Sequence, residues 1–123
     1  MNVLIVDDSR SMRMVLRQSL RLAGFDIRRA FEASDAAQAL THLRREEIDL
    51  ALVDLNMPGG DGLQLLAAMA RDPAMASVPA ILVSAANNPQ IIRRARERGA
   101  VAFLHKPFTP EDLAMVLDHA KVA

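Results

Sequence analysis

The chain has 123 residues, of which 51% are hydrophobic, and its 15 basic residues balance its 15 acidic ones. This length predicts one domain spanning residues 1–123 with a core of its own, and the composition excludes a disordered or fibrous chain. The absence of cysteine excludes disulfides, thiol nucleophiles and thiolate metal sites, and a net charge of zero argues against binding to nucleic acid through overall charge.

Short runs of almost purely apolar residues predict strands that are buried on both faces of a parallel sheet. Helical patterns lie between these runs, and a weaker, more polar run suits an edge strand. Five strand–helix repeats indicate a (βα)5 doubly wound α/β sheet. In chain order we expect a strand at 3–6, a helix over 9–24, the weak strand at 25–30, a helix at 33–45, a strand at 50–53, a helix at 62–70, a strand at 80–83, a helix at 88–98, a strand at 101–104 and a helix at 110–121.

Local signals support several of these helices. Asn88 followed by Pro89 predicts an N-cap and a first-turn proline, and the Thr-Pro-Glu-Asp sequence at 109–112 predicts a capping box. Asp61-Gly62 predicts a turn and the N-cap of the third helix. The first helix is expected to end at Gly24 and to place one apolar stripe against the core, formed by Met12, Val15, Leu16, Leu20 and Ala23.

Polar residues follow four of the predicted strands at the point where each strand ends. They are Asp7 and Asp8, Asp54, Ser84, and the His105-Lys106-Pro107 segment. The carboxyl ends of parallel strands lie along one edge of the sheet, where ligands bind in open α/β folds. We therefore expect three carboxylates, a hydroxyl and an ammonium group to meet at this edge.

Three carboxylates so close together raise one another's pKa unless a cation neutralises them. Mg²⁺ suits such a site, because it prefers oxygen ligands and keeps waters that a phosphate can replace. Lys106 adds a positive charge for phosphate oxygens, and Ser84 can donate a hydrogen bond to the same group. One of the carboxylates can then act as the nucleophile in a phosphoryl transfer, which needs mainly positioning and charge neutralisation.

The motifs at these strand ends resemble the receiver domain of two-component response regulators. They are VDDS at 6–9, VDLNMPGGDG at 53–62, LVSA at 82–85 and FLHKPF at 103–108, and together they span nearly the whole chain. The resemblance is closest to single-domain chemotaxis-type (CheY-like) regulators. It implies a flavodoxin-like sheet with strand order 2-1-3-4-5 and no output domain.

The resemblance also implies a role for each site residue. Asp54 would accept a phosphoryl group from a histidine kinase or a histidine phosphotransfer protein. Lys106 would bridge Asp54 and the phosphoryl group, before a cis peptide bond at Pro107. Mg²⁺ would be bound directly by Asp8 and Asp54, by the backbone carbonyl of Asn56, and through water by Asp7.

The same resemblance predicts a conformational switch. Ser84 would move toward the phosphoryl group and Phe103 would change rotamer, which would alter the surface around residues 87–110 for a downstream protein. The Pro-Gly-Gly loop after Met57 would leave room for a partner's phosphohistidine. Ala86 is small and would leave the phosphoryl site open to water and to partners.

Simpler interpretations exist for several of these residues. Asp8 or Ser9 is a common type of helix cap, and Phe103 can be ordinary core packing. His105 is expected to point away from the site because side chains alternate along a strand, and we interpret it as structural, together with His42 and His119.

Other functions are open at the level of sequence. A haloacid-dehalogenase-type phosphatase would need an acid two residues after the nucleophile, where Asn56 stands. A degenerate receiver that only binds partners conflicts with the complete set of phosphorylation residues. A phosphorelay shuttle or phosphate sink is a real alternative to control of a protein target. As a receiver, the protein would be no enzyme in the ordinary sense, since it would catalyse only its own phosphorylation and dephosphorylation.

The first predicted helix carries a basic face of Arg10, Arg13, Arg17 and Arg21. A solvated surface is the simpler interpretation, but we predict that Arg13, Met14 and Arg17 dock the phosphoryl donor, with Met14 as an apolar anchor. A weaker case for output contacts holds for Arg93, Arg94, Arg96 and Arg98. No apolar run reaches the roughly 20 residues of a membrane span, and no signal peptide is evident, so we expect a cytoplasmic monomer without nucleic-acid partners.

Overall fold

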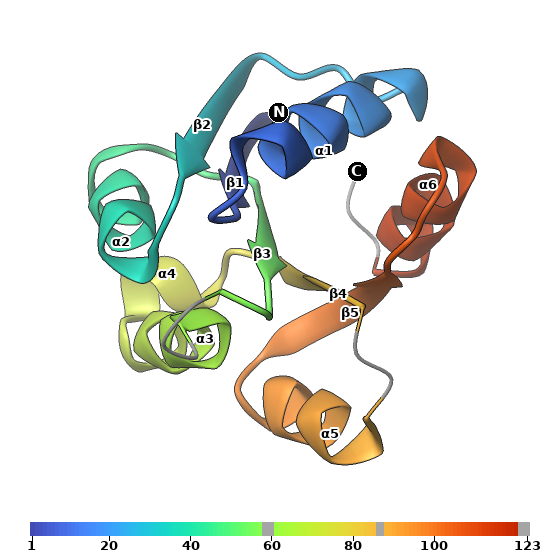
Figure 1. Cartoon of the computed structure of the whole chain (residues 1–123). Coiled ribbons are helices and arrows are strands. Elements are labelled where there is room, and N and C mark those ends of the chain that lie inside the picture. Colours follow the sequence, from blue (N-terminus) through green and yellow to red (C-terminus); the bar gives the residue numbers. More distant parts are fainter. Residues whose placement is uncertain (58–60, 86–87, 121–123) are drawn as a thin grey trace.

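The structure is a computed structural model that describes residues 1–57, 61–85 and 88–120. Its centre is a five-stranded parallel sheet with the order β2-β1-β3-β4-β5, which confirms the doubly wound prediction (Figure 1). The strands are β1 (Asn2–Val6), β2 (Arg29–Ala33), β3 (Leu50–Asp54), β4 (Ala80–Ser84) and β5 (Ala100–His105).

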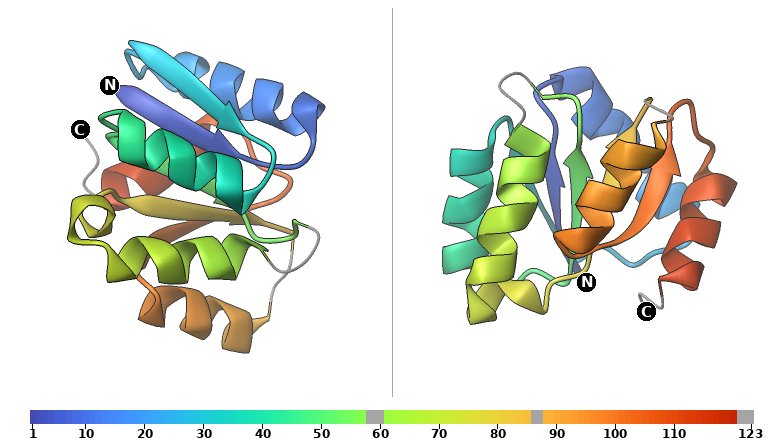
Figure 2. Two further views of the ribbon diagram at one scale, coloured as in Figure 1. Left: turned by 90° about the vertical axis from the view of Figure 1, so that its left-hand side faces the viewer. Right: turned by 90° about the horizontal axis from the view of Figure 1, so that it is seen from below.

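Helices cover both faces of the sheet (Figures 1 and 2). Helices α1 and α6 contact each other over one face, and α2, α3, α4 and α5 pack over the other. Their bounds are α1 (Arg10–Leu22), α2 (Ala36–Arg45), α3 (Asp61–Arg71), α4 (Pro73–Ala76), α5 (Pro89–Glu97) and α6 (Pro110–His119).

The inner strands are almost entirely apolar because their alternate side chains enter two separate cores. In β1, Leu4 and Val6 face the core under α2, α3 and α5, whereas Val3 and Ile5 face the core under α1 and α6. All four side chains have no exposed surface. This two-sided burial explains why the runs showed no polar alternation.

Capping residues begin the helices largely as predicted. Asn88 accepts a hydrogen bond from the Gln90 amide, and Thr109 and Asp112 form the complete capping box of α6. Ser9 caps α1 by accepting from the Met12 amide, so the simpler interpretation is correct for Ser9. Gly24 follows α1 with a φ of 93°, a left-handed conformation that glycine adopts without strain. The predicted capping role of the Asp61 side chain lies outside the described residues, as do the Pro-Gly-Gly loop and Ala86. The last helix ends at His119 with Ala120 as its C-cap, before the predicted end at 121.

The second strand lies at Arg29–Ala33, and the prediction of 25–30 was wrong in its position. Phe25 and Ile27 are partly buried against the core beneath α1 and α6, while the Arg28 amide bonds to the carbonyl of Met1. Their apolar character therefore reflects packing by a connecting segment. The predicted edge position is correct, since β2 pairs only with β1 among the described strands.

Three further details differ from the sequence predictions. The helix expected from residue 33 begins at Ala36, because Ala33 ends β2 and Asp35 caps the helix. Val15 was expected on the core stripe but is 48% exposed. The short helix α4, which begins after the N-cap Asp72, was not predicted. Among the described helices, none has the length and apolar character needed to cross a membrane.

Gly62 sets how closely α3 approaches the end of β3. A Cβ atom at this position would lie 2.6 Å from the Asp54 carbonyl oxygen and 2.9 Å from the Leu55 Cα. We predict that Gly62→Ala lowers the free energy of unfolding, because such overpacking costs about 1–3 kcal/mol whereas alanine gains only about 1 kcal/mol of helix propensity. Urea denaturation followed by circular dichroism measures this change.

Ala70→Gly, at an exposed position of the same helix, measures the propensity difference alone. If Gly62→Ala stabilised the protein by the amount that Ala70→Gly destabilises it, the close approach of α3 to β3 would carry no energetic constraint.

Candidate functional site

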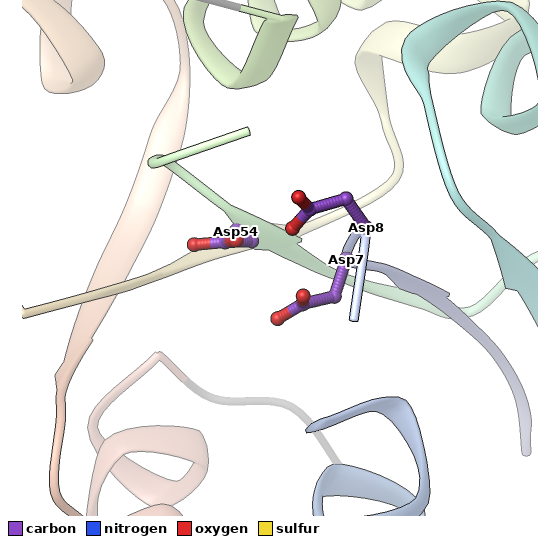
Figure 3. Close-up of side chains that lie close together, drawn as sticks. All are labelled: Asp7, Asp8 and Asp54. Carbon is purple, nitrogen blue, oxygen red and sulfur yellow. The ribbon is translucent and has the colours of Figure 1, made fainter. Parts of the chain in front are cut away.

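Three carboxylates meet at the carboxyl edge of the sheet, as the sequence predicted. Asp7 and Asp8 follow β1 directly, and Asp54 is the last residue of β3. One carboxylate oxygen from each residue lies within 4.8 Å of the other two, and Figure 3 shows the side chains gathered at the strand ends. Asp7 and Asp54 are buried, whereas Asp8 is exposed. The cluster is therefore anchored in the fold and open on the side of Asp8.

Asp7 is under electrostatic stress in this position. Its Oδ1 accepts a hydrogen bond of 2.8 Å from the Ser9 amide, but its Oδ2 is buried without a hydrogen-bond partner. Burial raises the pKa of the Asp7 carboxyl, and the charges of Asp54 and Asp8 raise it further, against the Ser9 amide and the Lys106 ammonium, which lower it. A bound cation would relieve this stress by neutralising the carboxylate.

Lys106 supplies a positive charge that forms ion pairs with two of the three carboxylates. Its Nζ lies 3.4 Å from Asp54 Oδ1 and 3.7 Å from Asp7 Oδ2. Its amide donates to the Ser84 carbonyl at 2.9 Å, and the Lys106–Pro107 peptide bond is cis, in agreement with the sequence prediction. The lysine side chain is 20% exposed, so it reaches the site from a partly covered position.

Ser84 and Phe103 lie on the neighbouring strands. Ser84 ends β4 and is buried, and Phe103 is partly buried in β5, opposite Leu82 in the strand register. Both side chains line a mostly apolar cavity of about 180 Å³, together with Ile91 and Ile92 of α5. The guanidinium of Arg96 lies 5.6 Å from the centre of the Phe103 ring. Phe103 therefore lines the cavity and also contacts an exposed residue of α5.

The remaining predicted residues take varied positions. The backbone amide of Asn56 donates a hydrogen bond of 3.1 Å to Asp54 Oδ1, which helps to fix the orientation of that carboxylate. His105 and His119 are exposed, and His42 lies against Phe31 with its Nε2 3.1 Å from the Glu32 carbonyl oxygen. In the part of the chain that the structure describes, none of these histidines belongs to the acidic cluster.

The predicted docking residues of α1 differ in exposure. Met14 is 62% exposed, and it lines a shallow surface groove with Arg17, Gln18 and Arg21. The Arg13 side chain is only 15% exposed, because its guanidinium bonds to Glu32 and to the Asp7 carbonyl. Glu32 was not among the predicted residues, because the predicted second strand ended before it.

Comparison with known proteins agrees with this geometry. Residues 3–118 match the family described as response regulator receiver domain. The chain belongs to this family. It is 34% identical over 118 residues to the chemotaxis protein CheY-3 of Vibrio cholerae, covering 96% of this chain and 89% of that protein. It is 33% identical over 113 residues to the cyclic di-GMP phosphodiesterase response regulator RpfG of Xanthomonas campestris, covering 92% of this chain and 30% of that protein.

Solved structures show the same fold. The chemotaxis response regulator CheY4 of Vibrio cholerae superposes with a TM-score of 0.84 at 28% identity, covering 97% of both chains. A response regulator from Thermotoga maritima superposes with a TM-score of 0.82 at 27% identity, covering 99% of this chain and 98% of that one. This chain is therefore a receiver domain of the CheY type with a flavodoxin-like sheet.

Receiver domains generally bind Mg²⁺ at an acidic cluster of this kind, and the residues present here fit such an ion. Hard divalent cations prefer carboxylate oxygens, and three are available at one point of the surface. The buried Asp7 Oδ2 has no hydrogen-bond donor, so a cation at the cluster would add to the compensation that the Lys106 ammonium provides from 3.7 Å.

We predict that Asp7→Asn stabilises the metal-free protein at pH 7, by about 1 kcal/mol, because it removes a buried charge that is incompletely compensated. Because the Asp7 pKa is raised, the folded state binds the Asp7 proton more tightly than the unfolded state does. The free energy of unfolding of the wild type therefore falls as the pH rises from about 3.9 through the folded-state pKa. Urea denaturation in EDTA between pH 3.5 and pH 7 measures the difference, which should shrink toward acid pH.

Added Mg²⁺ should reverse this order, because a ligand stabilises the state that binds it and the variant lacks one carboxylate. A wild-type protein that is as stable as Asp7→Asn in EDTA at pH 7 would show that crowding of the carboxylates costs nothing.

Proposed function

We propose that this receiver accepts a phosphoryl group on Asp54 from a histidine kinase or histidine phosphotransfer protein, in a reaction that depends on Mg²⁺. The observation that supports Asp54 best is its position beside Lys106, whose ammonium is nearer to Asp54 than to Asp7. Among the described residues, Asp8 is the exposed member of the cluster and forms no ion pair with Lys106, while Asp7 is the most deeply buried.

In the proposed reaction an oxygen of the Asp54 carboxylate attacks phosphorus, and the bond from phosphorus to the donor's imidazole nitrogen breaks. The electron pair of that bond stays with the imidazole. The Lys106 ammonium balances charge on the phosphoryl oxygens, and the Ser84 hydroxyl donates to one of them. Bound Mg²⁺ would be held by Asp8 and Asp54, by the Asn56 carbonyl and through water by Asp7, and would neutralise charge on the transferred group.

The proposed output is a change in the surface around residues 87–110. Movement of Ser84 toward the phosphoryl group would vacate space next to Phe103, on the cavity that both side chains line. A rotamer change of Phe103 would then break its contact with Arg96 on α5. This coupling gives a downstream protein partner two different surfaces to distinguish.

The first test is intact mass after incubation with acetyl phosphate, with and without Mg²⁺. We expect a Mg²⁺-dependent gain of one phosphoryl group in the wild-type protein and none in Asp54→Asn. Asp72→Asn is the matched control, because Asp72 caps α4 outside the cluster and asparagine is an equally good cap. Phosphorylation of Asp54→Asn at the wild-type rate would reject Asp54 as the acceptor.

We propose further that the phosphoryl donor docks on the α1 surface of Met14 and Arg17, with Arg13 at its buried margin. The exposure of Met14 and the groove beside it support this site. Met14→Asp should slow phosphotransfer from the cognate donor about 30-fold or more, because loss of an apolar anchor at an interface costs about 2 kcal/mol or more. Acetyl phosphate should still modify the variant at the wild-type rate, since a small donor needs no docking surface.

Met115→Asp is the matched control, because Met115 is 71% exposed on α6. Equal rates for Met14→Asp and wild type would reject the docking site.

The same assay separates the two possible outputs. Rapid return of the phosphoryl group to a histidine phosphotransfer protein supports a relay or phosphate sink. Retention of the phosphoryl group, with binding of another protein, supports control of a target.

A further inference from the structure

Arg13 makes contacts that the proposed phosphotransfer reaction does not require. Its Nη1 donates to the Asp7 carbonyl oxygen at 2.7 Å, and its Nε lies 2.9 Å from Glu32 Oε1. One guanidinium thus joins the β1–α1 turn to the edge strand β2. Arginine suits this task because its donors have a fixed planar arrangement, whereas lysine presents a single point charge.

The carbonyl that Arg13 binds belongs to the peptide between the two acidic residues. The Asp7 amide, on the other side of the same residue, donates to the Ala33 carbonyl at 3.0 Å. The backbone of Asp7 is therefore held by β2 on one side and by Arg13 on the other. The orientation of the Asp7–Asp8 peptide determines the direction in which the Asp8 side chain leaves the chain.

Asp8 depends on this backbone more than the other two acids do. Its carboxylate is exposed, and within the described ranges it has no hydrogen-bond or ion-pair partner. Asp54 in contrast is bound by Lys106 and by the Asn56 amide, and Asp7 is bound by the Ser9 amide. Asp8 reaches its place in the cluster because its main chain is fixed.

Glu32 orients Arg13 in turn. It lies on β2 opposite Ile5 of β1, its side chain is 35% exposed, and its second oxygen is 3.6 Å from Arg17 Nη1. Glu32 therefore shares its charge between two arginines, of which only Arg13 contacts the Asp7 carbonyl.

We infer that Arg13, oriented by Glu32, is a positioning residue for the cation site, which it serves by fixing the Asp7–Asp8 peptide. This inference rests on the proposed Mg²⁺ dependence. Groups that orient metal ligands typically contribute 10- to 100-fold to metal affinity, and the short bond from Arg13 to the ligand-bearing backbone places it in this class.

Coulomb repulsion alone predicts the opposite effect of removing Arg13. A positive charge beside the cluster repels a divalent cation, so its loss would tighten Mg²⁺ binding. Positioning predicts weaker binding when the same charge is lost. The direction of the change in Arg13→Gln therefore distinguishes the two effects.

The test measures Mg²⁺ affinity by isothermal titration calorimetry, and folding by circular dichroism, for wild type, Arg13→Lys, Arg13→Gln and Arg17→Lys. Arg13→Lys keeps the charge and is expected to bind about tenfold more weakly, and Arg13→Gln at least as weakly. Arg17→Lys, which changes the other partner of Glu32, should stay within twofold of wild type. Wild-type affinity in Arg13→Lys, or tighter binding in Arg13→Gln, would overturn the inference.

Hydrogen exchange of the Ser9 amide gives a second readout in the metal-free protein. This amide bonds to Asp7 Oδ1, so release of the Asp7–Asp8 peptide should speed its exchange several-fold in Arg13→Lys but not in Arg17→Lys. Absence of Mg²⁺ binding by wild type would reject the proposed function, while unchanged exchange would reject positioning by Arg13. If Arg13→Lys does not fold, Glu32→Gln takes its place in the exchange measurement, where loss of the group that orients Arg13 should again speed exchange of the Ser9 amide.

Discussion

The organisation of this protein depends on like charges that the sheet brings together. Parallel strands deliver all their carboxyl ends to one edge, and three of the residues placed there are aspartates. When the three carboxylates and Lys106 are ionised, their charges sum to −2, from three negative charges and one positive one. One divalent cation matches this excess, and a phosphoryl group arriving with its own negative charge then meets a site that is neutral instead of repulsive.

Such a cluster persists only because the backbone beneath it cannot relax. β1, β3 and β4 are buried on both faces, so moving Asp7 or Asp54 apart would disturb two cores at once. In addition to the two cores, the close approach of α3 at Gly62 limits movement of the Asp54 backbone. The stability of the core thus holds the carboxylates in an arrangement that their own repulsion opposes.

Much of this organisation could be predicted from sequence, because burial on both faces leaves a clear pattern. The four apolar runs correspond to β1, β3, β4 and β5, and the residue after each run identified the site. The edge strand was misplaced because Phe25 and Ile27 are apolar for another reason: they belong to the segment that connects α1 to β2, and they pack against the core. An apolar pattern reports burial, and it does not distinguish a paired strand from a covered loop. Glu32 was overlooked for the same reason, since its importance appears only when β2 is placed beside β1.

Arg13 shows a different limit of sequence analysis. Helical spacing correctly groups it with Arg10, Arg17 and Arg21, but spacing gives the direction of a side chain and not what stands opposite it. Side chains in helices lean toward the N-terminus, so a long residue in the first turn of α1 can reach back to the strand end that precedes the helix. Arg13 does so, and Arg17, one turn later, reaches Glu32 but not the Asp7 carbonyl. A basic helix face can therefore divide into one residue that serves the acidic site from within and others that remain available to a partner.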